Sequence, residues 1–266
     1  MDLVTAKSRA IGAWDERSAP RNSLIPDDDE QDFLPRRRFD PRRSKLHHDV
    51  PLEELVQYDE QRQVARLAMR HPRTGAIEVD ESTVVVAIDA ACRDTGRSSA
   101  RAAWAVCFGP ASCRRNECGV LPLRAISSLL KSARPVPQTV PRAEIEALAR
   151  ALQAVANLTR GDFAVREVIV RSHSEFLVRA MSEWIEEWIE NKGRRECGTR
   201  VPNFDALSDV SELVDDVEYG VGGGGGGDGN GESDEGSGGL EILFWHTHRD
   251  GTFSADWLVE YGFDEE

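Results

Sequence analysis

The stretch that decides the fold runs from Thr83 to Pro110 and reads TVVVAIDAACRDTGRSSARAAWAVCFGP. Its first part, Thr83 to Asp89, is apolar and β-branched, which is typical of a buried strand. A second part, Ala100 to Gly109, alternates small and large residues before a turn at Gly109-Pro110. Two antiparallel strands are therefore predicted, and Asn116 to Leu123 is predicted to add a third, more exposed strand.

The clearest helix lies downstream and reads PRAEIEALARALQAVANL, residues 141–158. It has a proline in its first turn and apolar residues at helical spacing. The elements predicted after it are a buried strand over 165–170, a helix over 174–190, a shorter helix after Asn203, a strand over 240–246 and a helix over 254–262. The order from Thr83, β-β-β-α-β-α-α-β-α, predicts an α/β fold in which a mixed sheet is flanked by helices.

The composition is that of an ordinary soluble chain, with 266 residues of which 40% are hydrophobic and 30% charged. Apolar runs such as Val84 to Ile88 are far too short to span a bilayer, and residues 1–20 lack the apolar core of a secretory signal. Five cysteines without a CxxC pair favour reduced thiols over a disulfide framework or a zinc site. We therefore expect an intracellular protein without membrane contact, with nucleus and cytoplasm both open.

The formal net charge of -14 does not exclude a polyanionic partner. Residues 203–266 contain 17 acidic residues and one basic residue, Arg249, so residues 1–202 together carry a formal charge of +2. Binding to phosphates rests largely on lysine and arginine, and the acidic excess is confined to the C-terminal quarter.

Two regions are predicted to lack a packed structure. Residues 1–80 form a largely disordered arm of mixed charge, with a candidate helix over 51–70. A cluster of five arginines in it, at positions 36, 37, 38, 42 and 43, suits a localisation signal, a phosphate-binding patch or a solvated linker, and His47-His48 is interpreted as linker composition. Residues 81–266 form one domain, interrupted by a flexible insert over 220–239 in which 12 of 20 residues are glycine.

Three acidic residues stand out by position. Asp89 ends an apolar strand, where a buried carboxylate needs a partner or water. Glu144 and Asp256 fall in the first turns of predicted helices, where helix-start electrostatics alone favours a carboxylate. If the three converged, they would form the hard oxygen site that Mg²⁺ prefers.

Four blocks of sequence resemble the ribonuclease H family, and they occur in that family's order. They are AIDAACRDTGRSSARAAWAVCFGP from Ala87, PQTVPRAEIEALARAL from Pro137, ECGTRVPNFDAL from Glu196 and FWHTHRDGTFSADWL from Phe244. The resemblance implies a ribonuclease H-like mixed sheet of five strands with flanking helices. It also implies that Asp89, Glu144 and Asp256 are catalytic residues that hold two divalent metal ions, Mg²⁺ or Mn²⁺.

One position of the family pattern differs. The segment VRSHSEFLV, residues 170–178, places His173 where the family has its third catalytic aspartate. A histidine cannot supply that negative charge, although imidazole is a tolerable ligand for softer divalent metals. The resemblance therefore leaves two hypotheses open. The first is an endonuclease that hydrolyses RNA in RNA–DNA hybrids, impaired by His173, and the second is a catalytically inactive nucleic-acid-binding or protein-interaction module.

The resemblance also implies an RNA–DNA hybrid as partner, a monomeric state, and Arg142 and Asn203 as nucleic-acid-binding residues. Hybrid recognition would use shape, phosphates and 2′-hydroxyls, so no sequence specificity is expected. Trp184 and Trp188 could stack on a nucleic acid, but an aromatic pair at helical spacing favours core packing. His246 and His248 match no firmly catalytic family position.

Overall fold

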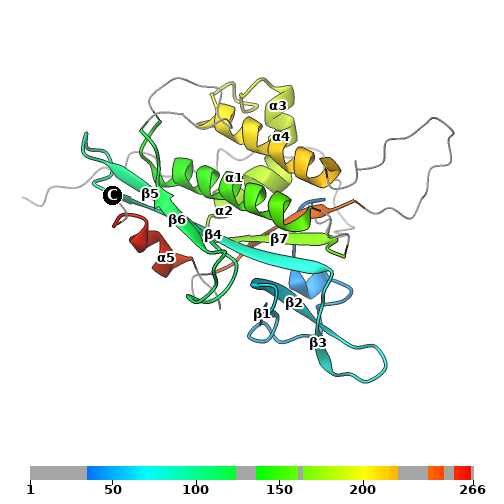
Figure 1. Ribbon diagram of the computed structural model, residues 1–266. Coiled ribbons are helices and arrows are strands. Elements are labelled where there is room, and N and C mark those ends of the chain that lie inside the picture. The colour runs from blue at the N-terminus through cyan, green and yellow to red at the C-terminus, as the bar shows by residue number, and fades with distance from the viewer. Residues whose placement is uncertain (1–34, 124–135, 161–163, 221–238, 249–254, 265–266) are drawn as a thin grey trace, which may run out of the picture.

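A computed structural model describes residues 35–123, 136–160, 164–220, 239–248 and 255–264 (Figure 1). The strands of its eight-stranded mixed sheet are β1 (Val56–Asp59), β2 (Val64–Arg70), β3 (Ile77–Val79), β4 (Thr83–Arg93), β5 (Arg101–Cys107), β6 (Glu117–Val120), β7 (Glu167–Ser172) and β8 (Glu241–His246). The α-helices are α1 (Val140–Thr159), α2 (Glu175–Arg179), α3 (Ile185–Glu190), α4 (Phe204–Gly220) and α5 (Asp256–Tyr261), and a π-helical segment, Ala180–Trp184, joins α2 to α3. Within these described segments, each helix is too short or too polar to span a membrane.

Strand β4 is the centre of the sheet, as its long apolar run predicts. Its first half pairs in parallel with β7, from Thr83–Glu167 to Ile88–Ser172, and its second half pairs antiparallel with β5. Strand β6 continues the sheet beyond β5, and β8 continues it in parallel beyond β7. The order β6-β5-β4-β7-β8 confirms the five strands predicted from Thr83 onward and the α/β class.

The N-terminal region differs from the prediction. The candidate helix over 51–70 is wrong, because this segment forms β1 and β2, an antiparallel hairpin paired from Val56–Leu67 to Asp59–Val64. Strand β2 also pairs with β3 and meets β4 at Val85, so the sheet gains three strands beyond the five. Pairing with the existing sheet overrides the helix-forming composition of this segment. Residues 1–34 and the Gly-rich stretch 221–238 lie outside the described residues.

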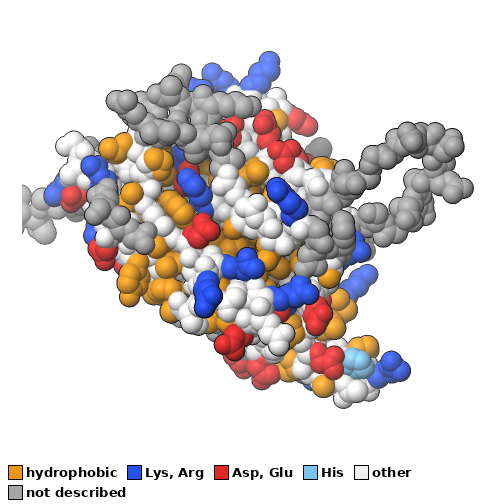
Figure 2. Space-filling view, viewed as in Figure 1, with side chains coloured by type: hydrophobic (Ala, Val, Ile, Leu, Met, Phe, Trp, Pro, Cys, Tyr) orange, Lys and Arg blue, Asp and Glu red, His pale blue; other side chains and the backbone are white. Residues whose placement is uncertain are grey.

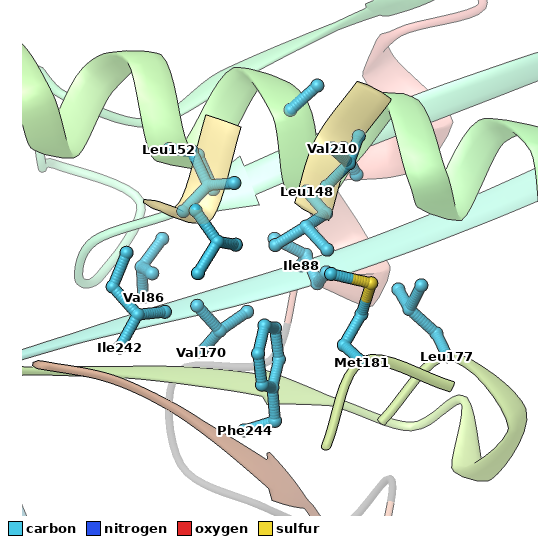
Figure 3. Packing of buried hydrophobic residues seen from close by; sticks show 14 of the residues in the cluster. Val86, Ile88, Leu148, Leu152, Val170, Leu177, Met181, Val210, Ile242 and Phe244 are labelled. Carbon is cyan, nitrogen blue, oxygen red and sulfur yellow. The ribbon is translucent and has the colours of Figure 1, made fainter. Parts of the chain in front are cut away.

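Helices cover both faces of the sheet. Figure 1 shows α1, α3 and α4 on one face and α5 on the other. The larger core lies under α1 and α4, where Leu148 and Leu152 of α1 and Val210 of α4 pack over Val86 and Ile88 of β4 (Figure 3). Helix α4 is 17 residues long, longer than the short helix expected after Asn203. The side chains of Trp184 and Trp188 are buried in this core, which confirms their predicted packing role.

A strap formed by residues 37–39 adds a short parallel connection to the outer edge of β8. The Phe39 N–H donates to the Phe244 carbonyl at 2.9 Å, and the Phe244 N–H donates to the Arg37 carbonyl at 2.8 Å. The Arg37 guanidinium lies 2.8 Å from carboxylate oxygens of both Asp215 and Glu218 on α4. Arg37 is therefore part of the folded domain, and the interpretation of this segment as a disordered arm is wrong for residues 35–80.

His47 also belongs to the fold. It is 2% exposed, and its Nδ1 lies 2.9 Å from the Ala68 carbonyl of β2. The ring of Phe39 packs at 6.2 Å from His47 and edge-on at 5.5 Å from Trp245 of β8. His47 is thus buried beside the hairpin of β1 and β2, and its interpretation as part of a linker is wrong.

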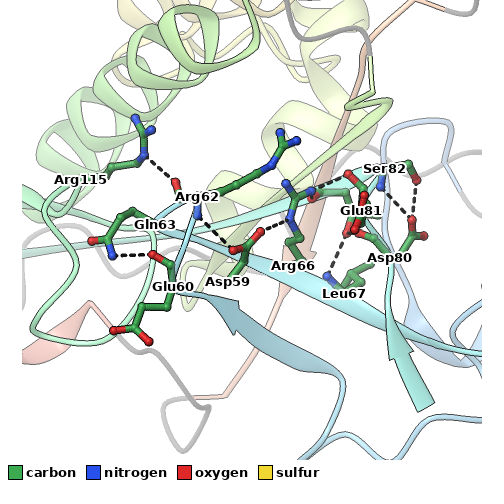
Figure 4. Close-up of polar contacts among 11 residues, drawn as sticks. Asp59, Glu60, Arg62, Gln63, Arg66, Leu67, Asp80, Glu81, Ser82 and Arg115 are labelled. Carbon is green, nitrogen blue, oxygen red and sulfur yellow. Dashed lines mark hydrogen bonds and ion pairs between the residues drawn. The ribbon is translucent and has the colours of Figure 1, made fainter. Parts of the chain in front are cut away.

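The first hairpin is held by a buried arginine (Figure 4). Arg66 is 1% exposed, and its guanidinium donates to the Asp59 carboxylate at 3.2 Å and to the Thr83 carbonyl at 2.8 Å. A Cβ atom at Gly109 would overlap the ring of Tyr58, so glycine there lets β1 pack against the end of β5. These contacts connect the hairpin of β1 and β2 to β4 and β5.

We expect Asp59→Asn to lower the free energy of unfolding by about 1–3 kcal/mol at pH 7, because the buried Arg66 loses its anionic partner. Burial raises the pKa of Asp59, but hydrogen bonds from the Arg62 amide and the Arg66 guanidinium outweigh burial, so the net pKa lies below its ordinary value. A carboxyl with a lowered folded-state pKa stabilises the fold above its unfolded pKa, and this contribution is lost as pH falls through the folded-state pKa.

The measurement is urea unfolding of both proteins at a series of pH values from 7 downward. The difference between them should shrink as pH falls below the ordinary aspartate pKa of about 4. Glu60→Gln, at an exposed position of the same turn, is the control and should stay within about 0.5 kcal/mol of the wild type. A pH-independent difference would mean that the Asp59 charge does not stabilise the hairpin.

Candidate functional site

The site lies where β4 and β7 pass their last paired residues. Ile88 of β4 pairs with Ser172 of β7, so Asp89 and His173 each follow by one residue on adjacent parallel strands. Asp89 also pairs with Ala105 of β5 and is 8% exposed. It lies within β4, which continues to Arg93, so the prediction that the strand ends at Asp89 is wrong. The fold therefore brings the first family carboxylate beside the position that departs from the family.

Glu144 reaches the site from the second turn of α1, and not from the first turn as predicted, because the helix begins at Val140. This helix begins after Thr139, whose side chain accepts from the Arg142 amide, and Pro141 occupies its first turn. The Ser174 hydroxyl, just beyond β7, donates to Glu144 Oε2 at 2.8 Å. Ser174 also caps α2 by accepting from the Leu177 amide, so one serine fixes both the start of α2 and the carboxylate of α1.

His173 and Asp256 face each other. His173 Nδ1 lies 2.8 Å from the Thr247 carbonyl, and because a carbonyl only accepts, Nδ1 carries the proton. The other ring nitrogen, Nε2, lies 3.9 Å from Oδ2 of Asp256, the first residue of α5. The side chains are 14% and 32% exposed, so the pair remains open to solvent on the Asp256 side.

Two contacts thus join sequence-predicted residues to neighbours, Ser174 with Glu144 and His173 with Asp256. The contacts of Ser174 and the Thr247 carbonyl were not assigned from the sequence. A serine before a predicted helix is a recognisable cap, but nothing in the sequence indicates that the same hydroxyl reaches Glu144. The Thr247 contact joins the ends of β7 and β8, and only the strand register reveals it.

Three other basic side chains lie near the site. Arg171, on β7, is 5% exposed, and burial lowers its pKa to about 10, while its guanidinium lies 5.0 Å from the centre of the Trp245 ring. His246 ends β8 level with Ser172, and burial lowers the pKa of its imidazole. His248 packs against it, with ring centres 5.8 Å apart.

The two residues expected to bind nucleic acid are Arg142, on α1 two residues before Glu144, and Asn203, before α4. Arg142 is 4% exposed, and its guanidinium is held by Glu146 at 3.4 Å on the same helix. This burial does not suit a surface contact with phosphate, contrary to what the resemblance implies. Asn203 is half-buried in a left-handed backbone conformation, with φ of 57°, immediately before α4.

The donor chemistry of the site suits magnesium. Asp89, Glu144 and Asp256 supply carboxylate oxygens, and Mg²⁺ is usually held by one or two carboxylates together with water and substrate phosphates. Across the described residues, no three His, Cys, Asp or Glu side chains lie close enough to hold one ion. The carboxylates therefore suit a hard divalent ion by donor type, but within the described segments they do not form a three-ligand site.

Comparison with solved structures gives several likenesses of low similarity. The foamy viral protease-reverse transcriptase in complex with dsDNA is 14% identical, with 67% of this chain and 92% of that chain covered and a TM-score of 0.42. The same viral protein in complex with an RNA/DNA hybrid is 12% identical, with a TM-score of 0.46 over 72% of this chain. The match spans 21% of the length of that viral chain.

A third solved structure, LC9-RNase H1, a type 1 RNase H with the type 2 active-site motif, is 16% identical. It matches with a TM-score of 0.35, over 64% of this chain and 66% of that chain. Structural likenesses at these scores carry no argument by themselves. Comparison with curated proteins gives no match. The family model for RNase H matches residues 81–235, more than half of the sequence, and the chain therefore belongs to the RNase H family.

Proposed function

We propose that this chain is a divalent-metal-dependent endonuclease that cleaves RNA within RNA–DNA hybrids. The observation that supports the proposal is that, in a chain of the RNase H family, Asp89 lies on the strand beside β7 while Ser174 and His173, just after β7, contact Glu144 and Asp256. Family membership and fold do not give activity without a suitable site. The proposal therefore depends on these three carboxylates acting together.

Enzymes of the RNase H family generally use divalent metal ions, and Asp89, Glu144 and Asp256 would hold two Mg²⁺ or Mn²⁺ ions here. Such ions, when bound, activate a water for attack on an RNA phosphate and stabilise the leaving 3′ oxygen. Ser174 holds the Glu144 carboxylate in place, and the Thr247 carbonyl fixes the ring of His173. Groups held in this way keep their orientation without further loss of entropy when substrate arrives.

The substrate class follows from the chemistry that the family shares. An RNA–DNA hybrid presents 2′-hydroxyls and base edges in a wide, shallow minor groove, so recognition by shape and backbone is expected. Binding would weaken as salt rises, because contacts with phosphates release counterions. We propose no preference for base sequence.

The test is cleavage of an end-labelled RNA–DNA hybrid by the full chain, in Mg²⁺ and separately in Mn²⁺. We expect internal cuts in the RNA strand only, and at least about tenfold faster cleavage in Mn²⁺, because imidazole at position 173 is a poor ligand for Mg²⁺. Single-stranded RNA, duplex RNA and duplex DNA are the controls and should remain intact. Absence of hybrid cleavage in both metals would overturn the proposal.

A second candidate function is metal-independent binding of the hybrid without cleavage. The observation that favours it is that protein groups already contact two of the carboxylates, Ser174 at Glu144 and His173 at Asp256. In this case hybrid affinity would persist in EDTA and fall with rising salt. Electrophoretic mobility of the labelled hybrid, measured on the same samples, separates this outcome from cleavage.

A further inference from the structure

A pocket outside the carboxylate site lies between α5 and the segment that leads into β6. Its volume is about 490 Å³, within the range of small-ligand sites. The lining residues that matter here are Trp104 of β5, Glu117 and Cys118 of β6, and Trp257 and Tyr261 of α5. Figure 2 shows hydrophobic side chains gathered at the lower left, where Figure 1 places α5.

The two aromatic residues that α5 contributes to the pocket are unusually exposed. Trp257 is 38% and Tyr261 60% exposed, although each has a large apolar surface. They lie one turn apart on α5, with ring centres 6.0 Å apart and planes at 77°. Rings presented to solvent in this way offer π faces for a flat or cationic group, and adjacent exposed apolar groups mark interaction sites.

The polar groups of the pocket select a ligand that donates hydrogen bonds. The Asn116 amide is already engaged, since Nδ2 donates to the Gly109 and Pro110 carbonyls and Oδ1 accepts from the Phe108 amide. Glu117 is exposed, and no ion pair to it is present among the described residues. A carboxylate at neutral pH only accepts, so the matching ligand carries donors and a positive charge.

Acidic side chains of α5 add negative charge beside the pocket, because the helix contains Asp256 and Glu260 and no basic residue. Among the described residues, no lysine or arginine lines the pocket, although the Arg150 guanidinium lies 5.3 Å from the centre of the Trp104 ring. A nucleotide would bring flat donors but also a phosphate, which the carboxylates of Glu117 and α5 repel, whereas they attract a guanidinium.

Helix α5 already binds a guanidinium on another side. The Arg93 guanidinium lies 4.1 Å from the centre of the Phe263 ring, just after α5, and 2.8 Å from Glu260 Oε2. An aromatic ring and a carboxylate therefore receive an arginine of this chain there. Trp257 and Tyr261 with Glu117 repeat these two chemical elements in the pocket.

We propose that this pocket binds an arginine side chain of a partner protein, with the guanidinium stacked on Trp257 and Tyr261 and paired with Glu117. Arginine combines a planar cation that stacks on aromatic rings with a fork of donors that fits a carboxylate. The site is separate from the proposed hydrolysis of hybrids, and its occupant is an exposed arginine-bearing segment. Lysine carries the same charge, but its ammonium group is not planar and cannot donate two parallel hydrogen bonds to a carboxylate.

The test uses the full chain and two labelled peptides that alternate glycine with arginine or with lysine, measured by fluorescence anisotropy. The wild type should bind the arginine peptide at least about fivefold more tightly than the lysine peptide. Glu117→Gln should weaken arginine binding about tenfold, and Tyr261→Ala about threefold. Glu212→Gln, which removes an exposed carboxylate of α4, is the matched control and should change affinity less than twofold.

Equal affinity for the two peptides would overturn the proposal, because charge alone would then explain binding. Unchanged affinity in both Glu117→Gln and Tyr261→Ala would place the peptide elsewhere and would also overturn it. Competition by guanosine monophosphate would assign the pocket to a nucleobase instead. Both substituted side chains are exposed, so circular dichroism is expected to show unchanged folding.

Discussion

Replacing Asp89 with asparagine is expected to lower the rate of hybrid cleavage at least about 100-fold. Asp89 is the most buried of the three carboxylates, at 8% exposed, and it stands where β4 meets both β5 and β7. Asparagine keeps the shape of the side chain and removes its charge, so the loss would reflect electrostatics and not packing. The measurement is initial rate against enzyme concentration, in Mn²⁺ and in Mg²⁺.

The matched control is Asp94→Asn, in the turn between β4 and β5. Asp94 is exposed and has a φ of 54°, a conformation that asparagine adopts readily, so this change should leave the rate within about twofold. Thermal unfolding of both variants checks that the fold is intact. Undiminished cleavage by Asp89→Asn would show that the activity does not arise at this carboxylate.

The second expected result is an increase in the rate of hybrid cleavage. His173→Asp should raise the rate in Mg²⁺ at least about tenfold, because it adds a hard, negatively charged ligand where the wild type has a histidine. The change removes one hydrogen bond, from Nδ1 to the Thr247 carbonyl. A modest loss of stability, about 1 kcal/mol, is therefore expected alongside the gain.

The variant His173→Asn separates the effect of the added negative charge from the effect of the smaller side chain. Asparagine has the size of aspartate and no negative charge, so it should lose the Thr247 contact without raising the rate in Mg²⁺. An equal gain in both variants would show that the imidazole only blocks the site. A loss of activity in His173→Asp would instead assign a positive role to the histidine next to Asp256.

The sheet from β4 onward was predictable because its strands are buried on both faces or alternate in polarity. Thr83 to Asp89 and residues 165–170 carry that signal within a few residues. The segment 51–70 lacks it: its residue types suit a helix, and its strands form by pairing with one another and with β4. Arg66 within it looks solvent-exposed in sequence, yet it is 1% exposed and bonded to Asp59.

The site residues could likewise be predicted from the sequence, whereas their contacts could not. Sequence motifs identified Asp89, Glu144, Asp256 and His173, because a motif consists of residue types in a given order and needs no structure. Their partners were not visible, since the distance from His173 to the Thr247 carbonyl depends on the register of two strands. The acceptors of Arg37 were hidden for a similar reason, because Asp215 and Glu218 lie 178 and 181 residues away.

The strap on β8 has a consequence for how the chain folds. Residues 37–39 are synthesised about 200 residues before their hydrogen-bond partner Phe244. Contacts of such separation close large loops and slow folding, since entropy is lost before the contact stabilises the chain. The sheet edge at β8 thus closes only after the intervening residues have been synthesised. Until then Arg37, Arg38 and Phe39 lack their contacts with β8 and α4, and their apolar and charged groups are open to chaperones.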